Sequence, residues 1–120
     1  MTYRLRLEIP GLPPMNTSAT RRHWAVQARE ARDTQTLVAA LVGKRRPPKP
    51  LKRARVTVTR CSPREPDFEN MTLSSKAHID GLVKARVLVD DNPDVCERVY
   101  RWAKAPRGQG RLVIDVEEIE

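Results

Sequence analysis

The sequence predicts one α+β domain spanning residues 1–120, with two helices packed on a mixed sheet of about four strands. Four segments alternate apolar and polar residues, which is typical of half-buried strands. Two longer segments repeat apolar residues at every third or fourth position, which is typical of amphipathic helices. The segments follow one another in the order β-α-β-α-β-β, and a length of 120 residues suits a single core.

The first strand is predicted over residues 3–9, where four apolar residues alternate with charged ones. The first helix is predicted over residues 20–42, and Gly43 follows it as a C-terminal stop. An apolar stripe indicates which face of this helix packs on the sheet, and Trp24 is expected to anchor that face in the core. The stripe comprises Trp24, Ala28, Ala31, Gln35, Val38 and Leu41.

The rest of the chain completes the pattern. A second strand is predicted over 54–59 and a second helix over 71–86. A short apolar run at 87–89 follows, and two further strands are predicted over 95–103 and 111–117. The expected apolar side of the second helix comprises Ser75, Ile79, Leu82 and Val83.

The net charge of +8 is unevenly distributed along the chain. Residues 1–60 carry 14 Lys and Arg against 3 Asp and Glu, a net of +11, whereas residues 61–120 carry 9 against 12, a net of −3. A basic half predicts attraction to a polyanion. Residues 44–50, KRRPPKP, form either a phosphate-contacting loop or a flexible surface loop, and both interpretations stay open.

Several classes of protein are disfavoured. The sequence contains no run of 18 apolar residues and no signal-peptide pattern, so a cytoplasmic protein without a membrane contact is expected. Cys61 and Cys96 form no CxxC pair and are expected to be ordinary thiols. His23 and His78 complete no zinc pattern, and His78 is expected on a helix surface rather than as a general base.

Acidic residues gather at both ends of a segment that begins at Asp67 and ends at Asp91, DFENMTLSSKAHIDGLVKARVLVDD. Glu69 lies two positions after the first acid, so in an extended segment both side chains point to one side. A helix that folds back would return Asp90 and its neighbour to the same place. Carboxylates with Lys76 between them are typical of sites for Mg²⁺ or Mn²⁺ and a phosphate.

The same residues also fit purely structural roles. The first two acids, taken alone, fit a solvent-exposed loop. Lys76 and Asp80 are one helical turn apart and fit a surface pair worth about 0.2–0.5 kcal/mol, so Asp80 is expected to be structural. The two acids at the end of the segment precede an Asn-Pro pair and fit ordinary turn residues.

Taken together, these motifs resemble those of the RusA family of phage-type Holliday junction resolvases. That family shows a DxDN motif, a lysine at the start of the following helix, a KxxxDxL run and a closing DD. The chain has DFEN at 67–70, KAHIDGL at 76–82 and DD at 90–91, and PPMN at 13–16 is similar to the family's PPxN element. The resemblance covers essentially the whole chain and is strongest from DFEN to just beyond DD.

The resemblance implies a homodimeric endonuclease that cuts four-way DNA junctions in recombination and repair, in a bacterial or phage-infected cell, with Mg²⁺ or Mn²⁺ as cofactor. Asp67, Glu69 and Asp91 would hold the metal, with Asp90 as a further ligand. Lys76 would stabilise charge on the phosphate. The candidate DNA contacts are Asn16, Arg21, Arg22, Lys44, Arg45, Arg46 and Arg64.

Two departures from the family pattern leave alternatives open. Glu69 stands where the family usually has Asp, and its extra methylene moves the carboxylate by about one bond length. Lys76 follows Asn70, which is expected to orient a carboxylate or a water, by six positions where some members have three. The alternatives are a DNA-binding protein of the same fold that has lost cleavage and a basic RNA-binding protein whose acids are structural.

Overall fold

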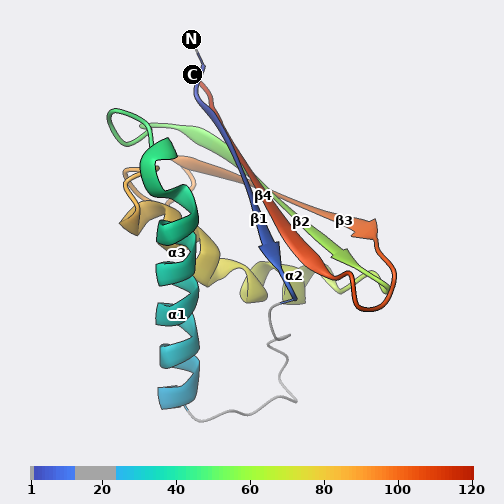
Figure 1. Ribbon diagram of the computed structural model, residues 1–120. Coiled ribbons are helices and arrows are strands. Elements are labelled where there is room, and N and C mark those ends of the chain that lie inside the picture. The colour runs from blue at the N-terminus through green and yellow to red at the C-terminus, as the bar shows by residue number, and fades with distance from the viewer. Residues whose placement is uncertain (1, 13–23) are drawn as a thin grey trace.

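A computed structural model describes residues 2–12 and 24–120 of the chain (Figure 1). Four strands form one mixed sheet and the helices lie on one face of it, which confirms the predicted α+β class. The strands are β1 (Arg4–Pro10), β2 (Ala54–Ser62), β3 (Cys96–Lys104) and β4 (Arg111–Glu118). The helices are α1 (Trp24–Val42), the short 3₁₀ helix η1 (Gly43–Arg45), α2 (Phe68–Ser74) and α3 (Lys76–Lys84).

The sheet has the strand order β1-β4-β2-β3. Strand β4 runs antiparallel to both of its neighbours, whereas β2 and β3 are parallel. A parallel pair needs a crossover connection, and α2 and α3 supply it. The register places Leu7 beside Ile114, Ile114 beside Val58, and Val58 beside Tyr100, so one row of side chains crosses all four strands on the helix-covered face.

The hydrophobic core lies between this face of the sheet and the helices. The strict alternation of buried and exposed residues along β1 shows that only one side of the strand faces the core. Each fully buried aliphatic side chain stabilises the fold by about 1.5–3 kcal/mol. The core includes Leu5, Leu7, Ile9, Val38, Val42, Val56, Val58, Ile79, Leu82, Leu88, Leu112, Ile114 and Val116.

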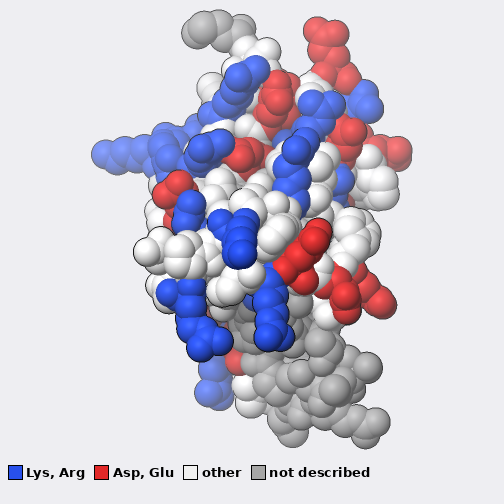
Figure 2. Space-filling view, turned by 90° about the vertical axis from the view of Figure 1, so that its right-hand side faces the viewer, with Lys and Arg blue, Asp and Glu red and all other residues white. Residues whose placement is uncertain are grey.

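The other face of the sheet carries charges of both signs. Glu117 on β4 lies 3.2 Å from Arg4 on β1 and 4.0 Å from Arg55 on β2, and Arg55 lies 2.9 Å from Glu97 on β3. A view from the right-hand side of Figure 1 shows basic and acidic side chains interspersed (Figure 2). Exposed pairs of this kind contribute about 0–1 kcal/mol each to stability. Because both signs are present, this face is not a patch of one charge.

Helix α1 buries only part of its predicted apolar stripe. Val38, which belongs to the stripe, is buried near the C-terminal end, and so is Val42, which does not. The prediction that Trp24 anchors the core is wrong, because its side chain is 75% exposed. Trp24 opens the helix, and it lies 14 positions before Val38, which is about 21 Å along the helix axis. The core ends before the first turns of α1.

The predicted single helix over 71–86 is two helices, α2 and α3, which meet at Ser75. The backbone of Ser75 leaves the helical region, with φ −104° and ψ 0°. Its hydroxyl donates to the carbonyl oxygen of Met71 at 2.7 Å, and the hydroxyl of Ser74 donates to the same oxygen at 3.2 Å. Such side-chain bonds compete with the backbone ladder, so the serine pair breaks the helix and gives α3 its own direction.

The end of α1 is tied to the edge strand β1. Gly43 has φ +48°, the left-handed conformation that ends many helices, which confirms the predicted stop. Arg45 follows in η1, and its guanidinium donates to the carbonyl oxygen of Arg6 at 3.2 Å and to that of Leu41 at 2.7 Å. The hydroxyl of Tyr3 donates to the carbonyl oxygen of Arg45 at 2.6 Å.

Two further expectations concern compartment and thiols. Within the described ranges, no helix has the length and apolar character that a membrane crossing requires. Cys61 and Cys96 are both buried and free, as expected for ordinary thiols. Burial raises the pKa of the Cys96 thiol, which keeps it protonated at neutral pH.

The contact between α1 and α3 at Gly81 yields the first prediction. A Cβ added at Gly81 would lie 2.8 Å from Cβ of Val38 and 3.2 Å from Cα of Gln35, atoms that move only with the backbone of α1. Overpacking costs about 1–3 kcal/mol, against about 1 kcal/mol that alanine gains over glycine in a helix. We expect Gly81→Ala to lower the free energy of unfolding by about 1 kcal/mol in urea titrations.

Lys84→Ala, at an exposed position of the same helix, is the control and should change stability by less than about 0.5 kcal/mol. A Gly81→Ala protein that is more stable than the parent would contradict the close approach of the two helices.

Candidate active site

The chain segment before β3 is fixed by a short parallel bridge between Leu51 and Leu88. The backbone amide of Leu51 donates to the carbonyl oxygen of Val87 at 2.8 Å, and the amide of Val89 donates to that of Leu51 at 3.1 Å. The apolar run predicted at 87–89 is therefore anchored beside Leu51, three residues before β2 begins. It holds the two following aspartates in a defined place.

Asp90 shapes the turn that follows. One of its carboxylate oxygens accepts from the backbone amide of Asp91 at 2.7 Å and the other from the side-chain amide of Asn92 at 2.9 Å. These hydrogen bonds hold the pKa of Asp90 below its usual value. The side-chain oxygen of Asn92 accepts from the amides of Asp94 and Val95 at 3.0 and 3.1 Å. Asp90 therefore serves a turn, in line with its structural interpretation.

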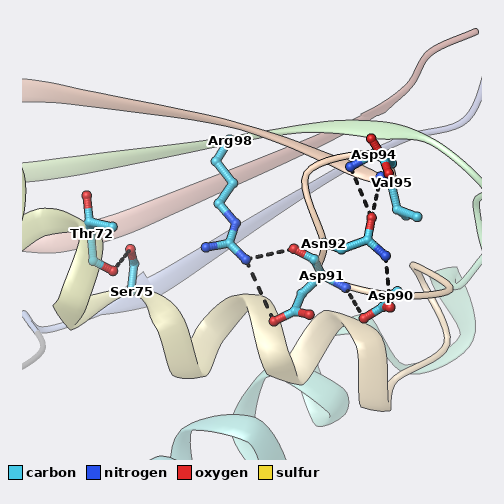
Figure 3. Close-up of polar contacts among 8 residues, drawn as sticks. All are labelled: Thr72, Ser75, Asp90, Asp91, Asn92, Asp94, Val95 and Arg98. Atoms are coloured by element: carbon cyan, nitrogen blue, oxygen red, sulfur yellow. Dashed lines mark hydrogen bonds and ion pairs between the residues drawn. The ribbon is translucent and has the colours of Figure 1, made fainter.

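Asp91 instead faces β3 (Figure 3). The side chain of Arg98 reaches from β3 to this residue, where Nη2 donates to the backbone carbonyl oxygen at 2.8 Å and lies 3.7 Å from the carboxylate oxygen Oδ2. Both side chains are about one-third exposed. Arg98 shares the helix-covered face of β3 with Tyr100, so the contact lies between the sheet and the helices.

Asp80 on α3 joins this pair. Burial raises the pKa of Asp80, the positive charge of Lys76 opposes that rise, and a side-chain hydrogen bond with Asp91 adds to it. Arg98 also acts on Asp80 and opposes the rise. Lys76, Asp80, Asp91 and Arg98 therefore form a charged cluster at the junction of α3, the 90–92 turn and β3.

Two members of the charged cluster were predicted as site residues from the sequence, and the other two were not. Lys76 and Asp91 were placed in the site but Asp80 was expected to be structural, although the spacing of four residues already put Asp80 on the same helix face as Lys76. Arg98 had no such indication, because its proximity to Asp91 depends on how β3 packs beneath the turn.

Asp67 and Glu69 lie at the start of α2. Asp67 is the residue before the helix, with an extended backbone and no side-chain capping bond, and Glu69 is in the first turn. The expectation that both side chains point the same way along an extended segment is wrong, because Glu69 is helical. Both residues are exposed.

Phe68 connects the two halves of the motif. Its ring packs edge-on against Tyr100, with ring centroids 5.6 Å apart at 90°, yet Phe68 is 68% exposed. Tyr100 lies two residues beyond Arg98 on the same face of β3, which is about 6.6 Å along the strand. The start of α2 and the charged cluster therefore lie over neighbouring positions of one strand.

The fit of this region to a metal ion can be judged from its donors. Among the described residues, no group of three or more His, Cys, Asp and Glu side chains is placed to hold a metal. Asp80 and Asp91 nevertheless carry the hard oxygen donors that a divalent cation prefers, and their like charges act on each other. The carboxylate beside Asp91 is that of Asp80, not that of Asp67 or Glu69.

The remaining candidates are spread over the molecule. Lys76, the first residue of α3, is exposed, and Asn70 in α2 is half-buried. Asn16, Arg21 and Arg22 lie outside the described residues. Lys44, Arg46 and Arg64 are exposed, whereas Arg45 is bound to the edge of β1.

His78 departs from expectation. It was expected on the surface of a helix, but it is only 4% exposed, because α3 presents it with Ile79 and Leu82 to the interior. Burial lowers the pKa of His78 to about 4, and a hydrogen bond with the backbone of Ser75 opposes this only in part. A neutral imidazole at this position belongs to the fold rather than to the charged cluster.

No protein-family model matches the chain, and no curated protein matches its sequence. The assignment of a function therefore rests on the motif residues and on their arrangement.

The burial of His78 predicts acid sensitivity. Because its folded pKa of about 4 lies below an unfolded value near 6.5, its contribution is present above pH 6.5 and is lost as the pH falls toward 4. We expect the free energy of unfolding to drop by about 2 kcal/mol between pH 7 and pH 5 from this group alone. Urea titrations at the two pH values measure the drop.

The comparison uses His23→Gln protein, in which His78 is the sole remaining histidine, with and without His78→Leu. The leucine variant should show a correspondingly flatter pH dependence, whatever its absolute stability. If the free energy of unfolding depended equally on pH in both proteins, His78 would be protonated as easily in the folded chain as in the unfolded chain.

Proposed function

We propose that the protein is a divalent-metal-dependent endonuclease that cuts four-way DNA junctions, as its resemblance to RusA-type resolvases implies. The observation that supports this most is the convergence of the motif. Lys76 and Asp91 each interact with Asp80 in the charged cluster, and Phe68 brings the Asp67–Glu69 end of the motif to the adjoining part of β3. Residues far apart in the sequence thus surround one stretch of one strand.

The chemistry assigned to each side chain follows from its type. Bound Mg²⁺ or Mn²⁺ would supply an activated water and neutralise charge on the scissile phosphate. Asp91 and Asp80 are the carboxylates best placed to hold such an ion, with Asp67 and Glu69 at the adjoining end. Lys76, exposed at the first turn of α3, would bind a non-bridging phosphate oxygen.

The substrate class rests on charge and symmetry. The net charge of +11 in residues 1–60 favours a polyanion, and exposed Lys44 and Arg46 would contact its phosphates. A four-way junction has two-fold symmetry and needs two cuts, which a homodimer with two identical sites would provide. The reaction would belong to DNA recombination and repair in the cytoplasm of a bacterial or phage-infected cell.

A junction-binding protein that does not cut is the second candidate. It is favoured by the absence of a three-acid cluster among the described residues and by the glutamate at position 69. Incubation with a labelled four-way junction, with and without Mg²⁺, separates the two, and parallel binding to linear duplex and to RNA tests the third alternative, an RNA-binding protein.

We predict that Asp91→Asn lowers junction cleavage in Mg²⁺ by at least about 100-fold while junction affinity in Ca²⁺ is unchanged or higher. The two effects differ in direction because the carboxylate binds the metal but repels the phosphate backbone. Lys76→Ala should also lose cleavage, but its affinity should stay level or fall slightly, since it removes an attraction.

Asp94→Asn is the matched control, because Asp94 is an exposed aspartate of the same turn whose carboxylate lies outside the charged cluster. It should cut at the parent rate. Glu69→Asp should retain or raise activity. An Asp91→Asn protein that cuts as fast as the parent would contradict the assignment of the active site.

The basic segment at residues 44–50, KRRPPKP, is expected to contribute to the salt dependence of DNA binding. Each phosphate contact contributes about −0.9 to the slope of log K against log salt, so Lys44→Ala with Arg46→Ala should flatten the slope for junction binding by about 1.8. Arg45 is left intact because it binds β1. Lys84→Ala with Arg107→Ala removes the same charge from exposed positions elsewhere, and its slope should change less. Equal slopes in the parent and in the loop variant would mean that this loop does not touch DNA.

A further inference from the structure

Arg98 holds Asp91 in an unusual way (Figure 3). Both contacts use the same nitrogen, Nη2, and the shorter one, at 2.8 Å, goes to the backbone carbonyl oxygen. The carboxylate oxygen lies 3.7 Å away, beyond hydrogen-bonding distance. Arginine usually grips a carboxylate through two parallel hydrogen bonds, and that fork is not used here. The guanidinium is therefore anchored to the main chain and only loosely paired with the carboxylate.

The charges around Asp91 explain why a cation is needed at this point. The like charges of Asp80 and Asp91 act on each other, and the guanidinium of Arg98 lies 3.7 Å from the carboxylate of Asp91. Two neighbouring carboxylates are stabilised by a proton or by a nearby positive charge. Arg98 supplies such a charge without any ligand bound. A divalent ion at Asp91 would meet the positive guanidinium and would relieve the same repulsion, so the two cations compete.

We propose that Arg98 is a built-in counter-cation that competes with the divalent ion for Asp91 and, once displaced from the carboxylate, binds the phosphate of the DNA. This rests on the proposed function. The backbone anchor keeps the guanidinium in place during the exchange, because the bond to the carbonyl oxygen of Asp91 does not involve the carboxylate. The guanidinium also interacts with the side chains of Cys96 and Tyr100 on the same strand, and its planar fork is suited to a phosphate oxygen pair once it turns to the DNA.

The exchange makes metal and phosphate binding mutually dependent. If phosphate draws Arg98 away from the carboxylate, it raises the affinity of Asp91 for the cation, and linkage requires the cation to raise the affinity for phosphate by the same factor. Couplings between sites are typically 5–150-fold. Through Arg98, DNA and the divalent ion would bind cooperatively. The site would therefore have a low affinity for the metal in the absence of DNA.

The test measures Ca²⁺ binding by isothermal titration calorimetry, with and without an excess of four-way junction DNA, under conditions without cleavage. We expect junction DNA to tighten Ca²⁺ binding by about tenfold in the parent protein. Arg98→Met should bind Ca²⁺ about tenfold more tightly than the parent in the absence of DNA, and junction DNA should then tighten it no further. Arg98→Lys keeps the charge without the fork, so it should bind Ca²⁺ as weakly as the parent.

Arg101→Met is the control, because Arg101 is an exposed arginine on the opposite face of β3 and the variant changes the net charge equally. It should keep the parent affinity and the parent coupling. Ca²⁺ binding by Arg98→Met that equals or falls below that of the parent, or a coupling that survives the substitution, would overturn the proposal.

A separate Mg²⁺ assay of junction cleavage by the parent distinguishes this failure from failure of the proposed function. A parent that cuts the junction but shows no effect of Arg98 on Ca²⁺ binding retains its function and refutes the role of Arg98. A parent that binds no Ca²⁺ at millimolar concentration, alone or with DNA, overturns the counter-cation proposal as well as the metal site.

Discussion

The parallel pairing of β2 and β3 is the constraint on which the rest of the structure depends. Two parallel neighbours cannot be joined by a tight turn, so the chain must return across the sheet before β3 begins. Here α2 and α3 make that return, and the motif residues lie along it. Asp67 follows the end of β2, Lys76 starts α3, and Asp91 precedes β3. The crossover gathers them over one face.

Much of the fold follows from local periodicity. All four strands were predicted to within three residues of their observed ends, because alternation is a strong indication when one face of a sheet is buried. The break at Ser75 was missed, because serine is compatible with a helix until its hydroxyl finds a backbone acceptor. The position of Trp24 was missed because a helical stripe shows which residues share a face, but not where the core beneath that face ends.

The candidate site was predictable only in part. Its motif acids and lysine were chosen from their types and spacing, and Lys76 and Asp91 do lie in one cluster. Asp67 and Glu69 were predicted as the partner carboxylates on the assumption of an extended backbone, whereas the carboxylate that interacts with Asp91 is that of Asp80. Arg98 and Asp80 are neighbours of Asp91 through tertiary packing, which no local pattern in a single sequence reports.

The hydrogen bond from Arg45 to the carbonyl oxygen of Arg6 has a consequence for self-association. The carbonyl oxygen of Tyr3 accepts from the amide of Glu118 on β4. The even-numbered residues of β1, which include Arg6, therefore direct their carbonyl oxygens away from the sheet. An outward carbonyl on an edge strand is a template for pairing with another chain. Any strand that adds to this edge must first displace the guanidinium. The residue first considered as a DNA contact thus opposes aggregation through β1.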